Sequence, residues 1–324
     1  MRMGADDNRR MDPNTVAFDG ACRLDDWGLI RASGADAAGF LHSQLTSDIA
    51  HLGAGQARLA GYCSPKGRLL ASFVIWRDAA GDVLLACSAD VLPATLKRLR
   101  MFVLRAKCTL SDASTELPLY GLAGASATRW LDNAAPGAPW TSRESDGATV
   151  IALPDAAGCA RALCASPRAP ELPPLAAGDW RWLEVRSGVA RVVAATAEQF
   201  VPQMLNYELL GGVDFQKGCY PGQEVVARSQ YRGSIKRRSL LFEIDAEVRA
   251  GEPVFARDDP AQPAGMVVNA APQPAGCAAR SVALVEVRLA ALGGTGLHLG
   301  RADGPELRRA ELPYDVPIET DALS

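Results

Sequence analysis

Apolar residues recur at two different periods in the first 238 residues, which predicts a mixture of strands and helices. Residues 69–76 and 83–87 are apolar runs joined by a polar segment at 78–82 that contains Gly81, a pattern typical of a β-hairpin. Residues 27–30 indicate another short strand. Helical periodicity is expected after the capping residues 33–36 and over 91–107, 125–133, 155–165 and 179–187.

The pattern changes from Ser239 onward to short strands between turns rich in Gly and Pro, without a strong helix. A connector at 167–178 holds four prolines and cannot be helical. We therefore predict an α+β fold with a frayed N-terminus at 1–20, a body over 21–238 and a C-terminal β domain, a small barrel or sandwich, over 239–324. The C-terminal strands are expected at 240–244, 253–256, 266–269, 282–290 and 306–312.

Composition narrows the class of protein. Lys and Arg number 34 against 37 Asp and Glu, a net charge of −3, which argues against coating nucleic acid through global charge. The eight cysteines are scattered without CxxC pairs, as suits a reducing cytoplasm. No stretch approaches the roughly 18 uncharged apolar residues of a membrane helix, and the start has no signal-peptide core. We expect a cytoplasmic protein that does not insert into a membrane.

Common catalytic signatures are missing. The chain has no GxxxxGK[ST] loop and no HExxH, and with three histidines we expect no permanently bound metal. The glycines at 293–296 follow a strand but open no helix, so a hairpin turn explains them better than a dinucleotide site.

The segment 215–224 (FQKGCYPGQE) differs in kind from the rest of the chain. Gly218 before Cys219 and the Pro-Gly pair after it predict a tight turn that displays the thiol. A neighbouring cation such as Lys217, one of only five lysines, lowers the pKa of a thiol, and Gln223 can donate and accept hydrogen bonds. A buried cysteine beside a structural turn is the alternative, and the residues alone leave both open.

Five cations in eleven residues follow this segment with no acid among them, which predicts a local anion site. Its ligand could be RNA phosphates, a polyglutamate tail or the next domain, and an ordinary solvated face is the alternative. The candidates are Arg228, Arg232, Lys236 and Arg237, together with Arg238.

Three of the six tryptophans, Trp27, Trp180 and Trp182, lie in two short segments and suggest a flat aromatic ligand, although core packing is the alternative. Taken together, these segments resemble the YgfZ family of folate-binding proteins, relatives of the T-protein aminomethyltransferase of the glycine cleavage system. The resemblance rests on 24–27 (LDDW), 34–36 with 44–48, 63–68 (CSPKGR), 200–206, 210–212, 217–224 (KGCYPGQE), 227–228, 232–233 with 236–237, and 312–314.

The resemblance implies two α+β subdomains interleaved in sequence, a C-terminal β-barrel and a central channel for tetrahydrofolate or a derivative. It also implies a role in assembling or repairing iron–sulfur enzymes, including radical enzymes that thiomethylate tRNA. Direct tRNA contact would use the cations at 228–238, here called the basic strip. Cys219 matches the functional cysteine, with Lys217 and Gln223 beside it. Trp27 and Trp180 match folate-facing aromatics, and Trp182 and Tyr220 are further candidates.

One departure from the T-protein is informative. That enzyme uses an aspartate to handle the reacting amine, whereas 67–72 (GRLLAS) here contains no acid, which argues against glycine cleavage. Relatives can carry an acid where this chain has Arg186, so the pterin contacts there are expected to differ. Two rival hypotheses stay open: a tetrahydrofolate-dependent one-carbon transferase that uses another acid, and an RNA-binding module at 228–238.

Overall fold

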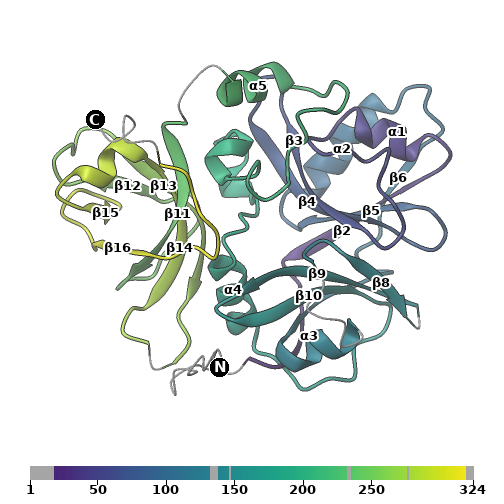
Figure 1. Cartoon of the computed structure of the whole chain (residues 1–324), viewed down its shortest axis with the longest axis horizontal. Helices are drawn as coiled ribbons and strands as arrows, with labels where there is room; N and C mark the ends of the chain where they lie inside the picture. The colour runs from purple at the N-terminus through teal and green to yellow at the C-terminus, as the bar shows by residue number, and fades with distance from the viewer. Residues whose placement is uncertain (1–17, 132–137, 146, 232–234, 276, 319–324) are drawn as a thin grey trace, which may run out of the picture.

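The computed structural model describes residues 18–131, 138–145, 147–231, 235–275 and 277–318. The expected frayed N-terminus therefore lies almost wholly outside the described residues, and so does Arg232. Within these ranges the chain forms three antiparallel sheets, two in the body and one at the C-terminal end (Figure 1).

The first sheet has the strand order β3-β4-β5-β2-β6 and carries two helices on one face. Its second strand β4 (Leu69–Arg77) is mostly apolar because both of its faces are covered. Phe73 and Ile75 pack under the helices, while Val74 and Trp76 face the second sheet. The other elements are β2 (Trp27–Ser33), α1 (Ala37–His42), β3 (Ala57–Cys63), β5 (Val83–Ser88), α2 (Leu92–Phe102) and β6 (Thr109–Asp112).

The second sheet has the order β1-β7-β10-β9-β8, so that its first strand precedes the whole first sheet in sequence. The two subdomains are thus interleaved along the chain. Its strands are β1 (Gly20–Arg23), β7 (Leu119–Ala123), β8 (Ser142–Ser145), β9 (Ala148–Ala156) and β10 (Cys159–Ala165), with α3 (Gly124–Trp130) on the outer face.

The helix expected at 155–165 is wrong: these residues form the end of β9, a turn, and β10. Its Ala-rich composition favoured a helix, but Leu163 packs on the inner face of the sheet while Ala162 and Cys164 pack on the outer one. That alternation is the period of a strand. The turn places Ala157 and Gly158 at positive φ, which ends any helical path.

The C-terminal sheet curls into a half-barrel beside the body (Figure 1). A bridge between His298 and Glu306 joins its two ends, and α4 (Ala177–Arg186) packs between this sheet and the body. In strand order it comprises β15 (Leu297–Leu299), β12 (Pro253–Ala256), β13 (Gly265–Pro272), β14 (Ser281–Arg288), β11 (Arg237–Ile244) and β16 (Leu307–Ala310), with the short helix η3 (Leu289–Gly293) after β14.

The segment that joins body and half-barrel contains the short helices η1 (Ala194–Thr196) and η2 (Pro202–Leu205) and then α5 (Gln223–Tyr231). The Cys219 turn immediately precedes α5, which lies at the upper edge of the body in Figure 1. Within the described residues, no helix is long and apolar enough to cross a membrane.

Candidate functional site

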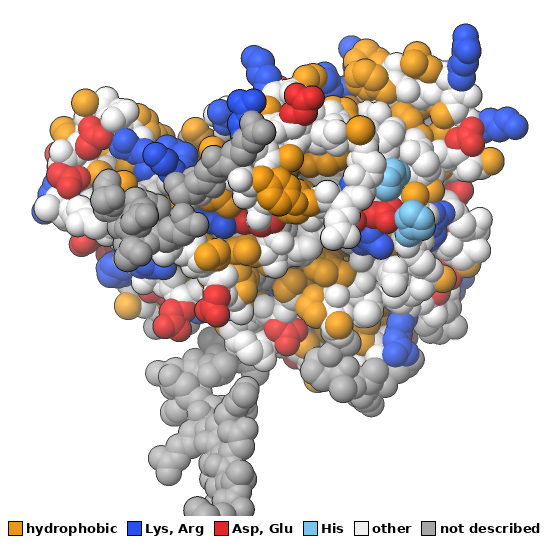
Figure 2. All heavy atoms as spheres, turned by 45° about the horizontal axis from the view of Figure 1, so that its top comes forward, with side chains coloured by type: hydrophobic (Ala, Val, Ile, Leu, Met, Phe, Trp, Pro, Cys, Tyr) orange, Lys and Arg blue, Asp and Glu red, His pale blue; other side chains and the backbone are white. Residues whose placement is uncertain are grey.

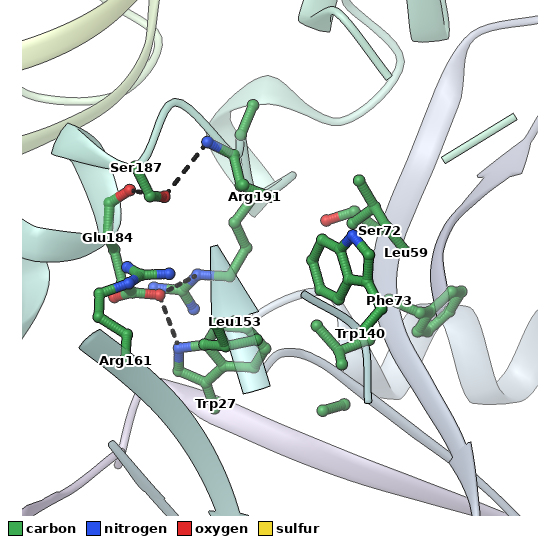
Figure 3. Close-up of a pocket in the computed structure, with 14 residues that line it drawn as sticks. Trp27, Leu59, Ser72, Phe73, Trp140, Leu153, Arg161, Glu184, Ser187 and Arg191 are labelled. Atoms are coloured by element: carbon green, nitrogen blue, oxygen red, sulfur yellow. Dashed lines mark hydrogen bonds and ion pairs between the residues drawn. The ribbon is translucent and has the colours of Figure 1, made fainter. Parts of the chain in front are cut away.

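A cavity lies at the centre of the body, and its volume of about 450 Å³ includes space that is open to solvent. Both sheets line it, and α4 with the segment that follows it forms one wall (Figure 3). Its lining is mostly apolar with a few polar side chains: Trp27, Leu59, Ser72, Phe73, Val74, Ala86, Trp140, Leu153, Arg161, Glu184, Ser187, Val189, Ala190 and Arg191.

The polar wall of the cavity is built around the carboxylate of Glu184, on α4. Trp27 Nε1 donates a hydrogen bond to Glu184 Oε1 at 3.2 Å, and Arg191 Nε lies 3.8 Å from the same oxygen (Figure 3). Burial raises the pKa of Glu184, and the charge of Arg191 opposes this rise in part. The arrangement holds a desolvated acid against one side of the cavity.

Arg191 in turn orients the indole of Trp27. Its guanidinium carbon lies 4.7 Å from the centre of the Trp27 ring, a cation–π contact. Arg191 Nη2 also pairs with Asp26 Oδ2 at 2.7 Å. Trp27 is therefore fixed by contacts from both Arg191 and Glu184.

Arg161 is a buried cation whose hydrogen bonding is incomplete. Its Nε donates to the carbonyl oxygen of Pro154 at 3.1 Å, but among the described residues its Nη1 has no partner. Burial lowers the pKa of Arg161 to about 10, although Glu184 opposes the shift. Because an unpaired buried donor costs free energy, this nitrogen indicates a place for a ligand acceptor.

Trp140 lies where the cavity meets the surface. Together with Leu59 it lines both the cavity and an open groove that carries Arg58. Trp140 has φ +71°, which is uncommon outside glycine, and hydrogen bonds to Ala152 and Ala57 at 2.8 and 2.7 Å hold it there. On the opposite side Glu184 and Arg191 border a second hollow toward the C-terminal sheet, so the cavity shares lining residues with a hollow on each of two sides.

The predicted aromatic contacts fall in different places. Trp27 lines the cavity, but Trp180 is only 1% exposed and packs against Gly121, where an added Cβ would lie 2.3 Å from the ring. Trp182 donates from Nε1 to Gln273 Oε1 at 2.6 Å and so faces the C-terminal sheet. Tyr220 is buried near Lys217, away from the cavity lining. The structure brings only Trp27 of this set to the cavity.

Cys219 is exposed on its turn, as the flanking Gly and Pro residues predict. Gly222 has φ +81°, and an added Cβ would lie 2.4 Å from the carbonyl oxygen of Ser64. The cysteine turn therefore packs directly on the turn of the CSPKGR motif. Gln223 Oε1 accepts the backbone N–H of Tyr220 at 3.2 Å, so this side chain closes the turn.

Lys217 anchors the same turn to α1. Its Nζ donates to the carbonyl oxygen of His42, and to that of Leu45 at 2.8 Å, and lies 4.9 Å from the centre of the Tyr220 ring. Burial lowers the pKa of Lys217 to about 8, while the charges of Asp48, Asp214 and Cys219 act in the opposite direction.

The structure divides the predicted basic strip. Arg237 forms an ion pair with Glu286 on the neighbouring strand β14, and Arg238 is buried against Glu208, so neither cation is available as an open anion site. Arg228 and Lys236 are exposed. Within the described part of the chain, no group of three His, Cys, Asp or Glu side chains is arranged to hold a metal ion.

Sequence reasoning missed most of the polar side chains of the cavity. Arg161 was hidden in the segment expected to be a helix, and arginine is too common in this chain to stand out. Glu184 and Arg191 flank the Gly188 turn, but nothing local marks their charges as buried. Trp140 could have been found as a tryptophan after a stretch of sequence rich in Pro and Gly.

The fold defines the class of protein. The chain superposes on the glycine cleavage system aminomethyltransferase T of Bartonella henselae with a TM-score of 0.61, at 18% sequence identity, covering 92% of this chain and 86% of that one. It therefore has an aminomethyltransferase-like fold, as the sequence motifs predict. No family model matches the chain.

Relatives in sequence give the family. The chain is 33% identical over 229 residues to the tRNA-modifying protein YgfZ of Enterobacter sp. (strain 638), covering 66% of this chain and 68% of the relative. It is 34% identical over 237 residues to the tRNA-modifying protein YgfZ of Edwardsiella ictaluri (strain 93-146), covering 68% and 69%. The chain belongs to the YgfZ family, which confirms the resemblance seen in the sequence.

Proposed function

We propose that this protein binds tetrahydrofolate or a derivative in the central cavity and supports the assembly or repair of iron–sulfur enzymes, including those that thiomethylate tRNA. The observation that carries the folate part is the buried Arg161 Nη1, which has no hydrogen-bond partner within the described part of the chain and lies beside the Glu184 carboxylate. The tRNA part is supported by relatives that are named as tRNA-modifying proteins.

The residues of the cavity fit a reduced pterin. The amino group and ring N–H of a 2-amino-4-oxopterin form adjacent donors that a carboxylate such as Glu184 can accept together. Arg161 would donate to a ring acceptor, and Trp27 and Trp140 supply aromatic surface to the lining (Figure 3). Each adjoining hollow carries an arginine, Arg181 or Arg58, that can neutralise a carboxylate tail. Bound folate would supply a carrier for one-carbon groups.

Within this proposal Cys219 is the reactive thiol, because it is exposed and its turn is held rigidly by Lys217 and Gly222. All eight cysteines are free, which is the state expected in a reducing compartment, so we place the protein in the cytoplasm. Contact with tRNA phosphates would fall to the exposed Arg228 and Lys236.

Folate binding is tested by anaerobic calorimetric titration with tetrahydrofolate. We expect the wild type to bind and Glu184→Gln to bind at least about tenfold more weakly, because the amide offers one acceptor where the carboxylate offers two. Glu171→Gln, a change at an exposed glutamate, is the matched control and should bind as the wild type does. Equal affinities for all three proteins would refute the site.

The role of Cys219 is tested in cells that lack the protein, with thiomethylated tRNA nucleosides measured by mass spectrometry. Cys219→Ala should fold normally and fail to restore them. Cys277 is also exposed, so Cys277→Ala is the matched control and should restore them fully. Full restoration by Cys219→Ala would exclude this role.

A second candidate function is a one-carbon transferase with Glu184 in place of the missing aspartate. The raised pKa of this buried acid favours it, since acids that exchange protons at neutral pH are tuned in this way. Incubation with tetrahydrofolate and aminomethyl donors, whose carbon is already at the methylene level and which release ammonia on transfer, should then yield methylenetetrahydrofolate in the wild type and not in Glu184→Gln. No product across a panel of donors would remove this candidate.

A further inference from the structure

The imidazole of His42 lies beside the turn that carries Cys219. His42 is the last residue of α1, and an added Cβ on Gly218 would lie 3.5 Å from His42 Nε2. This ring nitrogen therefore faces the residue immediately before Cys219. The anchor formed by Lys217, which donates to the carbonyl oxygen of His42, fixes the turn at this end of the helix.

The other ring nitrogen of His42 is held by a carboxylate. His42 Nδ1 lies 2.9 Å from Asp48 Oδ1, and His51 Nδ1 lies 2.8 Å from Asp48 Oδ2. On the face shown in Figure 2, two histidine side chains flank acidic side chains, in agreement with these contacts. His51 is 82% exposed at its side chain, whereas His42 is 21% exposed.

Asp48 stays ionised over the whole neutral range. Partial desolvation alone would raise its pKa, but hydrogen bonds from His51 and the charges of His51 and His42 bring it down to about 2. An ionised carboxylate can only accept hydrogen bonds, so Nδ1 of His42 carries the proton. The backbone N–H of Ala50 also approaches this nitrogen, at 3.4 Å, and would donate to it only in the tautomer that carries the proton on Nε2. With the proton on Nδ1, Nε2 is left as the acceptor that faces the cysteine turn.

We propose that His42, oriented by Asp48, is the base that takes the thiol proton of Cys219. This inference rests on the proposed function, which makes Cys219 the reactive thiol. The S–H bond breaks and an N–H bond forms at Nε2, giving a thiolate beside an imidazolium, and no oxidant or reductant takes part. The same order of nucleophile, histidine and orienting side chain recurs in unrelated cysteine enzymes.

The charged groups around His42 come from three directions. Asp48 and His51 follow α1 in the chain, and Arg58 Nη1 on β3 lies 4.0 Å from Asp48 Oδ2. Lys217 and Asp214 belong to the segment that leads into the turn. A variant of His42 leaves all five of these groups in place, so a change in thiol reactivity can be assigned to the imidazole.

The test measures alkylation of the folded protein by iodoacetamide between pH 5.5 and 10, with the rate at each cysteine followed by peptide mass spectrometry. In the wild type we expect Cys219 to react about tenfold faster than Cys277 at pH 6.5. His42→Gln should lower the Cys219 rate at pH 6.5 by about tenfold and move the midpoint of its pH profile upward. Cys277 should react equally in both proteins.

His51→Gln is the matched control, because His51 contacts the same carboxylate but its side chain is largely exposed. It should keep the wild-type profile. Asp48→Asn is the second variant and should also move the midpoint of Cys219 upward, since it releases the Nδ1 proton from its fixed position.

The inference is wrong if His42→Gln reproduces the wild-type profile, or if His51→Gln shifts it as far as His42→Gln does. If His42→Gln does not fold, the Asp48→Asn profile decides the question in the same way. Alkylation requires neither folate nor tRNA. A normal profile for His42→Gln together with loss of tRNA thiomethylation in Cys219→Ala would overturn this inference and leave the proposed function standing.

Discussion

At the scale of single residues, the cavity depends on charges that are buried with few partners. Arg161 is 4% exposed, lies 5.2 Å over the ring of Trp180 and leaves one nitrogen unpaired among the described residues. Such a group is a poor contributor to stability in the absence of a ligand. We interpret it as a binding residue whose hydrogen bonding is completed by folate.

This interpretation predicts the behaviour of Arg161→Met. Because an apolar side chain of similar length avoids the desolvation of a cation, the free energy of unfolding should stay unchanged or rise by up to about 2 kcal/mol. The increase in Tm that tetrahydrofolate gives the wild type should be lost. Thermal denaturation with and without tetrahydrofolate measures both quantities.

Arg257→Met, at an exposed arginine, is the control and should keep the shift in Tm. A full ligand-induced shift in Arg161→Met would show that this arginine does not contact folate.

The sequence allowed Trp27 to be singled out, because tryptophan is rare and LDDW is a distinctive segment. It did not allow Glu184 or His42 to be assigned. Their roles depend on neighbours more than a hundred residues away, such as Trp27 for Glu184 and Gly218 for His42. A charge that becomes buried through distant packing leaves no local pattern.

At the scale of elements, the two glycine-containing turns at Gly67 and Gly222 support one another. An added Cβ on Gly222 would lie 2.7 Å from the backbone of Gly67 and closer still to Ser64. This contact explains why the CSPKGR and KGCYPGQE motifs occur together: each turn needs a neighbour without a side chain.

Gly222→Ala should therefore lower the free energy of unfolding by about 2–4 kcal/mol, since backbone strain and a steric clash add. Gly211 separates the two effects, because its φ is +72° but an added Cβ meets nothing within 4 Å. Gly211→Ala should lose only about 1 kcal/mol. Urea denaturation of both variants gives the comparison, and equal losses would contradict the packing of the two turns.

The hairpin of β4 and β5 could be predicted because its apolar runs and polar connection are local features. The β9–β10 hairpin could not, since its Ala-rich strands are covered on both faces and show no polar alternation. In such strands periodicity does not distinguish a helix from a sheet.

At the scale of the whole molecule, a buried polar network joins the body to the half-barrel. Arg238 on β11 pairs with Glu208 of the body, and Asn206 Nδ2 donates to the carbonyl oxygen of Ser239 at 2.7 Å. Tyr314 donates to the carbonyl oxygen of Gly188 at 2.8 Å. β1 and β7 pair directly, although all strands of the first sheet lie between them in sequence. This interleaved topology was expected from the family resemblance and not from local patterns.

Removing one partner of this network should be costly. Glu208→Ala leaves the Arg238 cation buried without its carboxylate, and we expect a loss of about 3–5 kcal/mol in urea denaturation. The control is Glu243→Ala, which breaks a half-exposed pair with Arg186 at 3.9 Å and should lose less than about 1 kcal/mol. Similar losses for both variants would show that the Arg238 pair is not a principal contact between the two parts.

The most direct test of the folate proposal is a crystal structure of the protein with tetrahydrofolate. The account predicts the pterin inside the central cavity, its amino edge on the carboxylate of Glu184 and a ring acceptor within hydrogen-bond distance of Arg161 Nη1. Folate bound elsewhere on the protein, with Glu184 and Arg161 unchanged and out of contact, would contradict it.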